Sequence, residues 1–230
     1  DFGVRNANGA LLAGAEGAYV DKVDQYEIGF KAQDLELGGG KLDVYGTLFK
    51  STTEESNITI TPPTGQIRKY DAKGLELEAF YKNGIFDLYA TATYTDAAIT
   101  DARNSAGVAN SALIGNQPQR QARLIWAVTP SVNLDQVRLS ASWIGTGDSF
   151  ANDANTLTQK GYSVVHLTGA VNLTDNLEFS LNVNNLFDKA GITESANDGR
   201  ESLFAGAPNT VTIGRSIQGR TMAANVRFKF

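Results

Sequence analysis

The sequence predicts an all-β chain built from long antiparallel strands. Apolar residues recur at every second position in segment after segment, and helical spacing is scarcely found. These segments are rich in Val, Ile, Thr, Tyr, Phe and Leu, which favour strands. Most are about 10 to 12 residues long, roughly twice the usual globular strand and close to the length that crosses a bilayer at a tilt.

We expect nine strands, each bounded by residues that favour turns or by long polar segments. Along each strand one face is apolar and the other is polar, as in Tyr26, Ile28 and Phe30 against Gln25 and Glu27. The expected strands span residues 23–34, 41–51, 72–83, 85–96, 120–130, 136–146, 161–172, 176–186 and 220–230.

The connections between these strands alternate between short and long. The short ones contain Gly, Asn or Asp and read as tight turns. Short turns at one end and long loops at the other are typical of an outer-membrane barrel, in which the apolar face meets lipid and the polar face meets the lumen. Nine passes then leave the C-terminus on the short-turn, periplasmic side. Short connections are 35–41, 83–86, 131–136 and 172–176, and long ones are 52–71, 97–119, 147–160 and 187–219, with 1–22 as the tail of another.

Aromatic residues fall near both ends of the strands, as two interfacial girdles would require. Tyr81, Phe86, Phe228 and Phe230 lie near the short turns, and Tyr26, Tyr94 and Trp143 lie near the long loops. The alternation by itself also fits a secreted β-sandwich. Strand length, loop asymmetry and aromatic placement together favour the barrel.

Composition excludes several classes of protein. The 230-residue chain has a formal net charge of −5 without clustered Lys or Arg, which argues against a nucleic-acid partner. It has no Cys, so disulfides and thiolate metal sites are ruled out. No run of about 18 apolar residues predicts a transmembrane helix. The chain starts at Asp1 without an initiator Met or a signal-peptide pattern, so we interpret it as a fragment or a processed product.

Catalysis, a cofactor and a metal site have little support in the sequence. His166 is the only histidine and no G-x-S-x-G motif accompanies it, so we expect no enzyme. The carboxylates of Glu27, Glu76 and Glu78 fall on the polar face, where we expect ion pairs with Lys31, Lys82 or Arg138 rather than acid–base chemistry. Segment 147–155 holds Asp148 and Asp153 but lacks EF-hand spacing, so we expect a solvated loop tip.

Five motifs together resemble the C-terminal part of the TonB-dependent receptors, active transporters of the Gram-negative outer membrane. The resemblance covers nearly the whole chain, so we assign residues 1–230 to the C-terminal portion of the receptor barrel. NVNNLFDK followed by a terminal strand that ends in Phe is its most specific part. It implies about nine or ten strands of a barrel of about 22, without the plug domain and the N-terminal strands. The motifs are VDQYEIGFKA (23–32), LDVYGTLFKS (42–51), GLELEAFY (74–81), LEFSLNVNNLFDKAG (177–191) and GRSIQGRTMAANVRFKF (214–230).

The resemblance implies uptake of a scarce or bulky nutrient, with a ferric siderophore favoured over an oligosaccharide or a cobalamin. The implied partners are TonB, acting through the missing plug, outer-membrane lipids and the barrel-assembly machinery. A passive porin-like channel and a soluble sandwich remain the alternatives. The segment would supply barrel wall, lumen and extracellular loops.

Candidate site residues fall into three groups. Long-loop aromatic and cationic residues could bind an anionic or hydroxyl-rich ligand. Polar-face residues would line the lumen and face the plug, and terminal apolar residues resemble the signal that the assembly machinery reads. The ligand candidates are Arg103, Phe150, Arg200, Phe204 and Arg215; the lumen candidates are Glu27, Glu76, Glu78, Arg138 and His166; the assembly candidates are Val226, Phe228 and Phe230.

Overall fold

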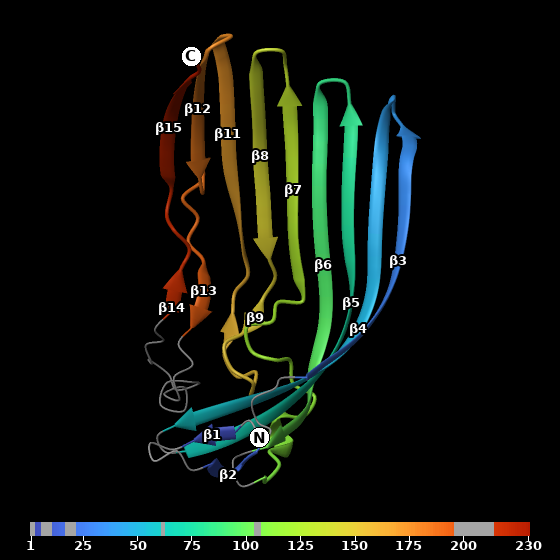
Figure 1. Cartoon of the computed structure of the whole chain (residues 1–230), viewed down its shortest axis with the longest axis vertical. Helices are drawn as coiled ribbons and strands as arrows, with labels where there is room; N and C mark the ends of the chain where they lie inside the picture. The colour runs from blue at the N-terminus through green and yellow to red at the C-terminus, as the bar shows by residue number, and fades with distance from the viewer. Residues whose placement is uncertain (1–2, 6–10, 17–21, 61–62, 104–106, 196–213) are drawn as a thin grey trace.

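The structure, a computed structural model, describes residues 3–5, 11–16, 22–60, 63–103, 107–195 and 214–230. Its centre is one antiparallel sheet of nine strands in the order β15-β12-β11-β8-β7-β6-β5-β4-β3, so sheet neighbours follow one another along the chain (Figure 1). All nine predicted strands are present, which confirms the all-β prediction. The strands are β3 (Lys22–Leu37), β4 (Gly40–Ile60), β5 (Pro63–Asn83), β6 (Phe86–Arg103), β7 (Leu124–Asn133), β8 (Val137–Thr146), β11 (Tyr162–Thr174), β12 (Leu177–Asn184) and β15 (Thr221–Phe228).

Three small hairpins and a 3-10 turn lie outside the main sheet, at its long-loop end (Figure 1). No tenth strand joins the main sheet within the described residues, so β3 and β15 are its edges there and the sheet does not close. None of the described helices is long and apolar enough to span a membrane. The small elements are β1 (Gly3–Arg5) with β2 (Leu11–Glu16), β9 (Ser149–Phe150) with β10 (Thr158–Gln159), β13 (Ile192–Ser195) with β14 (Gly214–Ser216), and η1 (Ser111–Leu113).

The short connections and the C-terminus lie at one end of the sheet, as predicted (Figure 1). The β3–β4 turn is tight, because Leu37 pairs with Gly40 across two residues, as Asn83 pairs with Phe86 in the β5–β6 turn. Those two residues, Gly38 and Gly39, have φ angles of 55° and 83°, a backbone conformation that favours glycine. A two-residue turn fixes the register of the long strands on either side of it.

Segment 52–71 is not the loop that the sequence predicted. β4 and β5 pair continuously from Lys41 with Lys82 to Ile60 with Pro63, and β6 likewise continues to Arg103. The hydrophobic alternation stops at the edge of the apolar band, but Thr- and Ile-containing strands pair without it. The prediction was wrong because a two-residue hydrophobic period shows only where one face of a strand meets apolar surroundings. It does not show where the pairing between strands ends.

The start of β7 also differs from the prediction, which placed it at residue 120. The strand begins at Leu124 because a turn precedes it, in which the Gln121 N–H donates to the Pro118 carbonyl at 3.4 Å. Arg120 within this turn has a φ of 61°. Residues 120–123 therefore belong to the long-loop region, which brings the Arg120 side chain to the mouth of the sheet.

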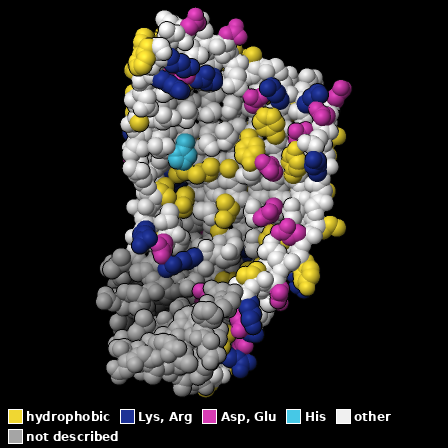
Figure 2. Space-filling view, in the orientation of Figure 1, with side chains coloured by type: hydrophobic (Ala, Val, Ile, Leu, Met, Phe, Trp, Pro, Cys, Tyr) yellow, Lys and Arg dark blue, Asp and Glu magenta, His cyan; other side chains and the backbone are white. Residues whose placement is uncertain are grey.

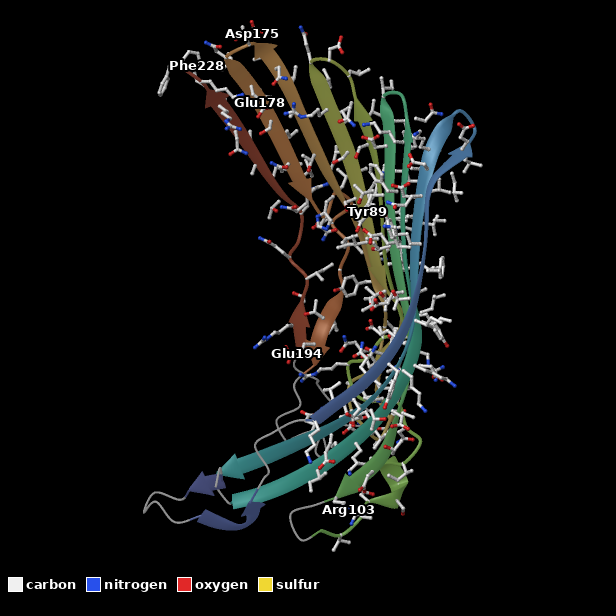
Figure 3. The ribbon with its side chains drawn as sticks, turned by 45° about the vertical axis from the view of Figure 1, so that its right-hand side comes forward. Tyr89, Arg103, Asp175, Glu178, Glu194 and Phe228 are labelled. Carbon is white, nitrogen blue, oxygen red and sulfur yellow. The ribbon has the colours of Figure 1, made fainter. Side chains whose placement is uncertain are left out.

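The register separates two faces, which we name here. The inner face carries Glu76 and His166, and the outer face carries Leu75, Trp143 and Phe228. In Figure 3 Glu178 and Tyr89 project into the hollow of the curved sheet, whereas Phe228 projects away from it. The sheet thus has a polar hollow side and an apolar outer side.

Apolar side chains of the outer face are exposed rather than packed in a core. Tyr26 is 76% exposed, Ile28 70% and Val226 70%, and Ile99 is the one large side chain that is fully buried among the described residues. A water-soluble sheet of this size would bury such a face. The exposed band is what contact with lipid requires.

Aromatic rings reinforce the outer face. Trp126 and Trp143 meet edge to face with their ring centroids 4.3 Å apart. The Trp126 ring also covers Gly145, where an added Cβ would come within 2.5 Å of it. Near the short turns Tyr81 contacts Phe86 at a centroid distance of 6.4 Å. The glycine lets a large ring lie flat on the strand that neighbours its own.

Candidate functional site

A half-open pocket of about 520 Å³ lies at the long-loop end of the inner face. β6, β7, β8 and β11 form its wall, and β10, β13 and the turn before β7 form its rim. Its lining mixes hydroxyl, amide, cationic and apolar side chains. It is lined by Thr91, Thr93, Arg120, Gln121, Ala122, Ile125, Trp126, Ala127, Ile144, Gly145, Thr146, Gly147, Ser149, Gln159, Lys160, Tyr162, Ile192 and Thr193.

Two arginines share one carboxylate at the rim. Arg120 Nη1 lies 2.8 Å from Glu194 Oε1, and Arg215 Nη1 lies 3.2 Å from Glu194 Oε2. Arg120 comes from the turn before β7, whereas the other two come from the β13–β14 hairpin. This charge cluster therefore ties the base of the last long loop to the pocket.

Gln159 lines the pocket, and its side-chain oxygen lacks a hydrogen-bond partner among the described residues. Its Nε2 donates to the Ile192 carbonyl at 3.0 Å, but its buried Oε1 has no hydrogen-bond partner among the described residues. A buried polar atom without a partner costs free energy. A ligand that brings an N–H or O–H group could satisfy it.

Lys160, beside Gln159, pairs with Asp148. Its Nζ lies 2.7 Å from Asp148 Oδ2, and the Gly161 N–H donates to Asp148 Oδ1 at 2.8 Å. The hydrogen bond from Lys160, followed by that from Gly161, lowers the pKa of Asp148 below its ordinary value. Because the lysine side chain is 81% exposed, it can swing to a ligand at little cost.

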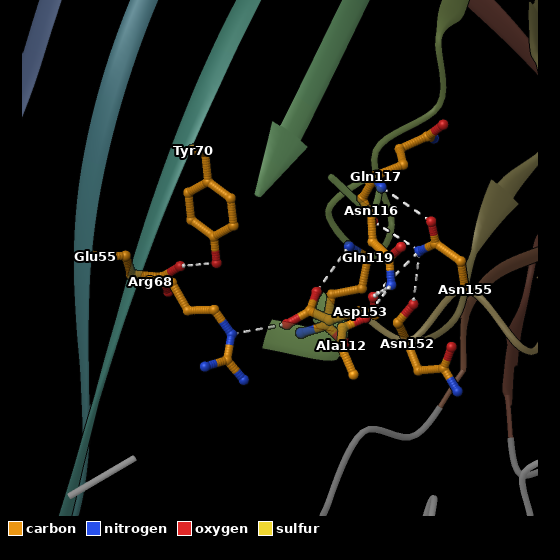
Figure 4. A network of polar contacts seen from close by, with 10 residues as sticks. All are labelled: Glu55, Arg68, Tyr70, Ala112, Asn116, Gln117, Gln119, Asn152, Asp153 and Asn155. Atoms are coloured by element: carbon orange, nitrogen blue, oxygen red, sulfur yellow. Dashed lines mark hydrogen bonds and ion pairs between the residues drawn. The ribbon is translucent and has the colours of Figure 1, made fainter. Parts of the chain in front are cut away.

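A polar network joins β5 to the 116–119 and 152–155 segments (Figure 4). Arg68 of β5 lies 2.9 Å from Asp153, whose other carboxylate oxygen accepts the Gln119 N–H at 3.0 Å. Asn155 accepts from the Gln117 N–H and donates to the Gln117 carbonyl, at 2.9 and 2.8 Å. Segment 147–155 is therefore packed, and the prediction of a solvated loop tip was wrong.

The predicted ligand residues do not form one cluster. Phe150 and Arg215 approach the pocket rim, since the Arg120 N–H donates to the Phe150 carbonyl at 2.7 Å and Arg215 shares Glu194 with Arg120. Arg103 is the last residue of β6, where it pairs with Asp101 at 2.8 Å, and it lies far from Glu194 of β13 (Figure 3). Arg200 and Phe204 lie outside the described residues. Sequence position alone could not separate the rim from the distant end of β6.

The register places the predicted lumen residues on the inner face. They are Glu27, Glu76, Glu78, Arg138 and His166. Figure 2 shows the face that carries the histidine, on which hydrophobic side chains lie among charged ones. That this face meets a plug stays a prediction.

The partners of these inner-face residues differ in part from the ion pairs expected. Glu78 accepts a hydrogen bond from the Tyr89 hydroxyl at 2.8 Å, and Arg138 pairs with Glu178 of β12. His166 Nδ1 lies 3.3 Å from Asn184 Oδ1. Side chains on other strands replace the expected lysines because strand order and register, which the sequence does not reveal, decide which side chains meet.

The assembly candidates lie on the outer side of the last strand. Val226 is opposite Phe179 and Phe228 is opposite Leu177, both in an apolar row. Phe230 follows the end of β15, fully exposed, with its ring 6.0 Å from that of Phe228. The Lys229 N–H still donates to the Asn176 carbonyl at 2.9 Å, which holds the chain end against the β11–β12 turn.

Sequence reasoning missed Arg120, Glu194, Gln159 and Lys160. They come from two long loops and, for Arg120, from the start of the strand predicted at 120–130, and nothing in their local sequence distinguishes them from other polar residues. The one usable signal is topological, because a meander brings the loops of neighbouring hairpins to the same end. A candidate list drawn from all long loops would have included Glu194, Gln159 and Lys160 without ranking them, and it would have missed Arg120.

The fold is a curved antiparallel meander with an apolar outer face and a polar inner face, and its short turns lie at one end. These features define the wall of an outer-membrane β-barrel. The family model described as "TonB dependent receptor-like, beta-barrel" matches residues 21–186, more than half of the chain. The chain belongs to the TonB-dependent receptor family. No curated protein sequence matches it.

Solved structures agree with the fold. The ferric yersiniabactin uptake receptor FyuA from Yersinia pestis is 18% identical, with a TM-score of 0.68 over 91% of this chain and 30% of its own. The ferric-catecholate import receptor Fiu from E. coli K12 is 18% identical, with a TM-score of 0.67 over 100% and 30%. The copper transporter OprC is 20% identical, with a TM-score of 0.64 over 98% and 33%. The chain thus spans about a third of the length of these proteins.

Proposed function

We propose that this chain forms the C-terminal wall of an active transporter in the outer membrane of a Gram-negative bacterium, and that its substrate is a ferric siderophore. The observation that carries the proposal is the pocket at the long-loop end, whose lining includes Arg120 and Lys160, and beside which Arg215 shares Glu194 with Arg120. Among the similar structures, FyuA and Fiu are named for ferric ligands. That likeness supports the substrate class without deciding the compound.

The chemistry of the pocket suits an oxygen-rich anion. Three cations face two carboxylates, Asp148 and Glu194, at the rim. Arginine forks bind carboxylate and phenolate oxygens through paired hydrogen bonds. The free Oε1 of Gln159 would accept from an amide or hydroxyl of the same ligand, and apolar walls would cover its hydrocarbon part.

Energy would come from TonB, acting on the plug domain that members of the family carry. The inner-face residues would support that plug, and the outer face would contact lipid. Insertion would depend on the barrel-assembly machinery, which would read the terminal strand. These roles come from the family and are proposals for this protein.

The test uses the full-length receptor in a strain that lacks its own copy. Growth of this strain is measured on single iron sources and on single oligosaccharides, each with and without TonB. The sources that support growth identify the substrate, and the dependence on TonB identifies the energy source. Arg120→Gln/Arg215→Gln should weaken ligand binding about tenfold or more, since a hydrogen bond to a charged group contributes roughly 1.5–3 kcal/mol. Lys229→Gln, at the opposite end of the sheet, should leave binding unchanged.

Each alternative has its own outcome. Uptake that does not depend on TonB would replace active transport with a passive channel. TonB-dependent uptake of copper, cobalamin or an oligosaccharide, without uptake of ferric chelates, would keep the transporter and overturn the substrate. A full-length protein that stays in the aqueous phase without detergent would overturn the membrane assignment.

A further inference from the structure

Two lysines lie directly opposite each other on the outer face. Lys50 of β4 pairs with Lys73 of β5, and both side chains are exposed. Like charges directly opposite in a sheet are destabilising. Among the described residues Lys50 makes no ion pair, and the Lys73 ammonium lies 3.9 Å from the Asp96 carboxylate. The lysine pair therefore has one counter-charge, the Asp96 carboxylate, at the long end of ion-pair distance from Lys73.

The lysine pair lies where the apolar band of the outer face ends. The neighbouring row, one step closer to the short turns, consists of Ile28, Leu48, Leu75 and Tyr94, which the register places side by side. Tyr26 lies opposite Lys50 in the lysine row itself and is 76% exposed. Tyrosine at the end of an apolar band marks the headgroup level of a membrane. The lysines are thus at the depth of lipid headgroups.

Charge changes sign beyond this row. The lysine row also holds Asp96, which Arg123 reaches at 3.4 Å, so three cations face one carboxylate. The next row away from the membrane carries Asp24 and Asp71 on either side of Thr52, whose hydroxyl donates to Asp71 at 3.0 Å. An anion is attracted at the lysine row and repelled one row further out.

We propose that Lys50 and Lys73 together bind the phosphate of an anionic lipid in the outer leaflet. A shallow groove of about 290 Å³ lies at the pair, between Asp71 and Asp96. Leu48 and Leu75, just below, offer a surface along which the lipid's acyl chains can lie. This contact with apolar side chains favours a lipid over free phosphate, which shares only the headgroup chemistry. The site is on the wall, so it stands whichever substrate the transporter carries.

The experiment measures lipid A binding to the full-length receptor in mild detergent by native mass spectrometry. Each lysine removed should weaken binding roughly fivefold, and Lys50→Gln/Lys73→Gln about 25-fold, because a basic residue near an anionic surface contributes about 1 kcal/mol. Lys31→Gln/Lys82→Gln removes the same charge from the inner face and should bind lipid A as the wild type does. Dephosphorylated lipid A should bind weakly to all three proteins.

Three results would overturn the proposal. The first is equal lipid A binding by wild type and Lys50→Gln/Lys73→Gln, with both proteins folded as judged by heat-dependent electrophoretic mobility. The second is undiminished binding of dephosphorylated lipid A. The third is displacement of lipid A by inorganic phosphate at equal concentration, which would make the pair a site for free phosphate.

Discussion

Replacing Asp153 with Asn should loosen the 116–119 and 152–155 segments without unfolding the barrel. Asn has nearly the same shape as Asp, and its side-chain oxygen can still accept the hydrogen bond from the Gln119 N–H. The substitution removes the negative charge that lies 2.9 Å from Arg68. The two side chains are 12% and 20% exposed. Breaking a fully buried pair costs roughly 3–5 kcal/mol. We expect about 2 kcal/mol here because some solvent reaches the pair.

The assay is hydrogen exchange of the full-length receptor in detergent, followed at peptides that contain the Gln117, Gln119 and Ala151 amides. These N–H groups donate to Asn155, Asp153 and the Leu157 carbonyl, so they report opening of the network. A loss of about 2 kcal/mol corresponds to roughly 30-fold faster exchange. Arg68→Gln in the Asp153→Asn background should add little further, because the two changes remove the same interaction.

Asp148→Asn is the matched control, since it breaks an exposed pair in the same loop. Exchange at the network amides should barely change, because exposed pairs contribute little. If Asp153→Asn exchanges at the wild-type rate while Asp148→Asn does not, the network is not what holds these segments and the reasoning from burial is refuted.

Three further predictions concern other parts of the chain. The Asp148 pKa is lowered by Lys160, so its stabilisation of the 147–161 segment is complete above the ordinary value of 3.8 and is lost as the pH falls below it; protection of the Gly161 amide that already disappears near neutral pH would contradict this. Gly161→Ala should destabilise the barrel by about 1–3 kcal/mol, because its Cβ would lie 2.3 Å from the Thr146 carbonyl oxygen. Gly147→Ala, whose Cβ meets only ordinary contacts at 3.5 Å, should have little effect on thermal stability. Deleting Phe230 should lower the amount of folded protein in the outer membrane more than it changes ligand affinity, and normal insertion would refute this.

The sequence predicted the main sheet because membrane strands repeat one simple constraint. A lipid-facing side chain must be apolar at every second position, as in Leu75, Leu77 and Ala79, and turn residues must end each pass. The constraint is absent beyond the bilayer, so the extensions of β4, β5 and β6 read as loops. The alternation located the membrane band correctly and left the length of the strands undetermined.

The candidate site was less predictable for a related reason. Arg120 and Glu194 meet at 2.8 Å although the predicted strand 120–130 and the long segment 187–219 are far apart in the sequence, and only the fold brings them together. Arg103 lies away from the pocket because β6 runs on as a strand and carries it away from the rim. In a loop region, composition indicates the kind of ligand, whereas register and strand length decide which side chains can meet it.

Strand extension past the membrane also gives the pocket its support. Arg68 lies on the part of β5 that continues beyond the apolar band, and its contact with Asp153 fixes the 152–155 segment to a strand rather than to another loop. The same segment leads into β10, which carries Gln159 to the pocket. Because a paired strand resists bending better than a free loop, the unpartnered acceptor of Gln159 is held in place before any ligand arrives. Binding there would then cost less ordering entropy than binding to mobile loops, which is the physical advantage of building a receptor mouth from over-long strands.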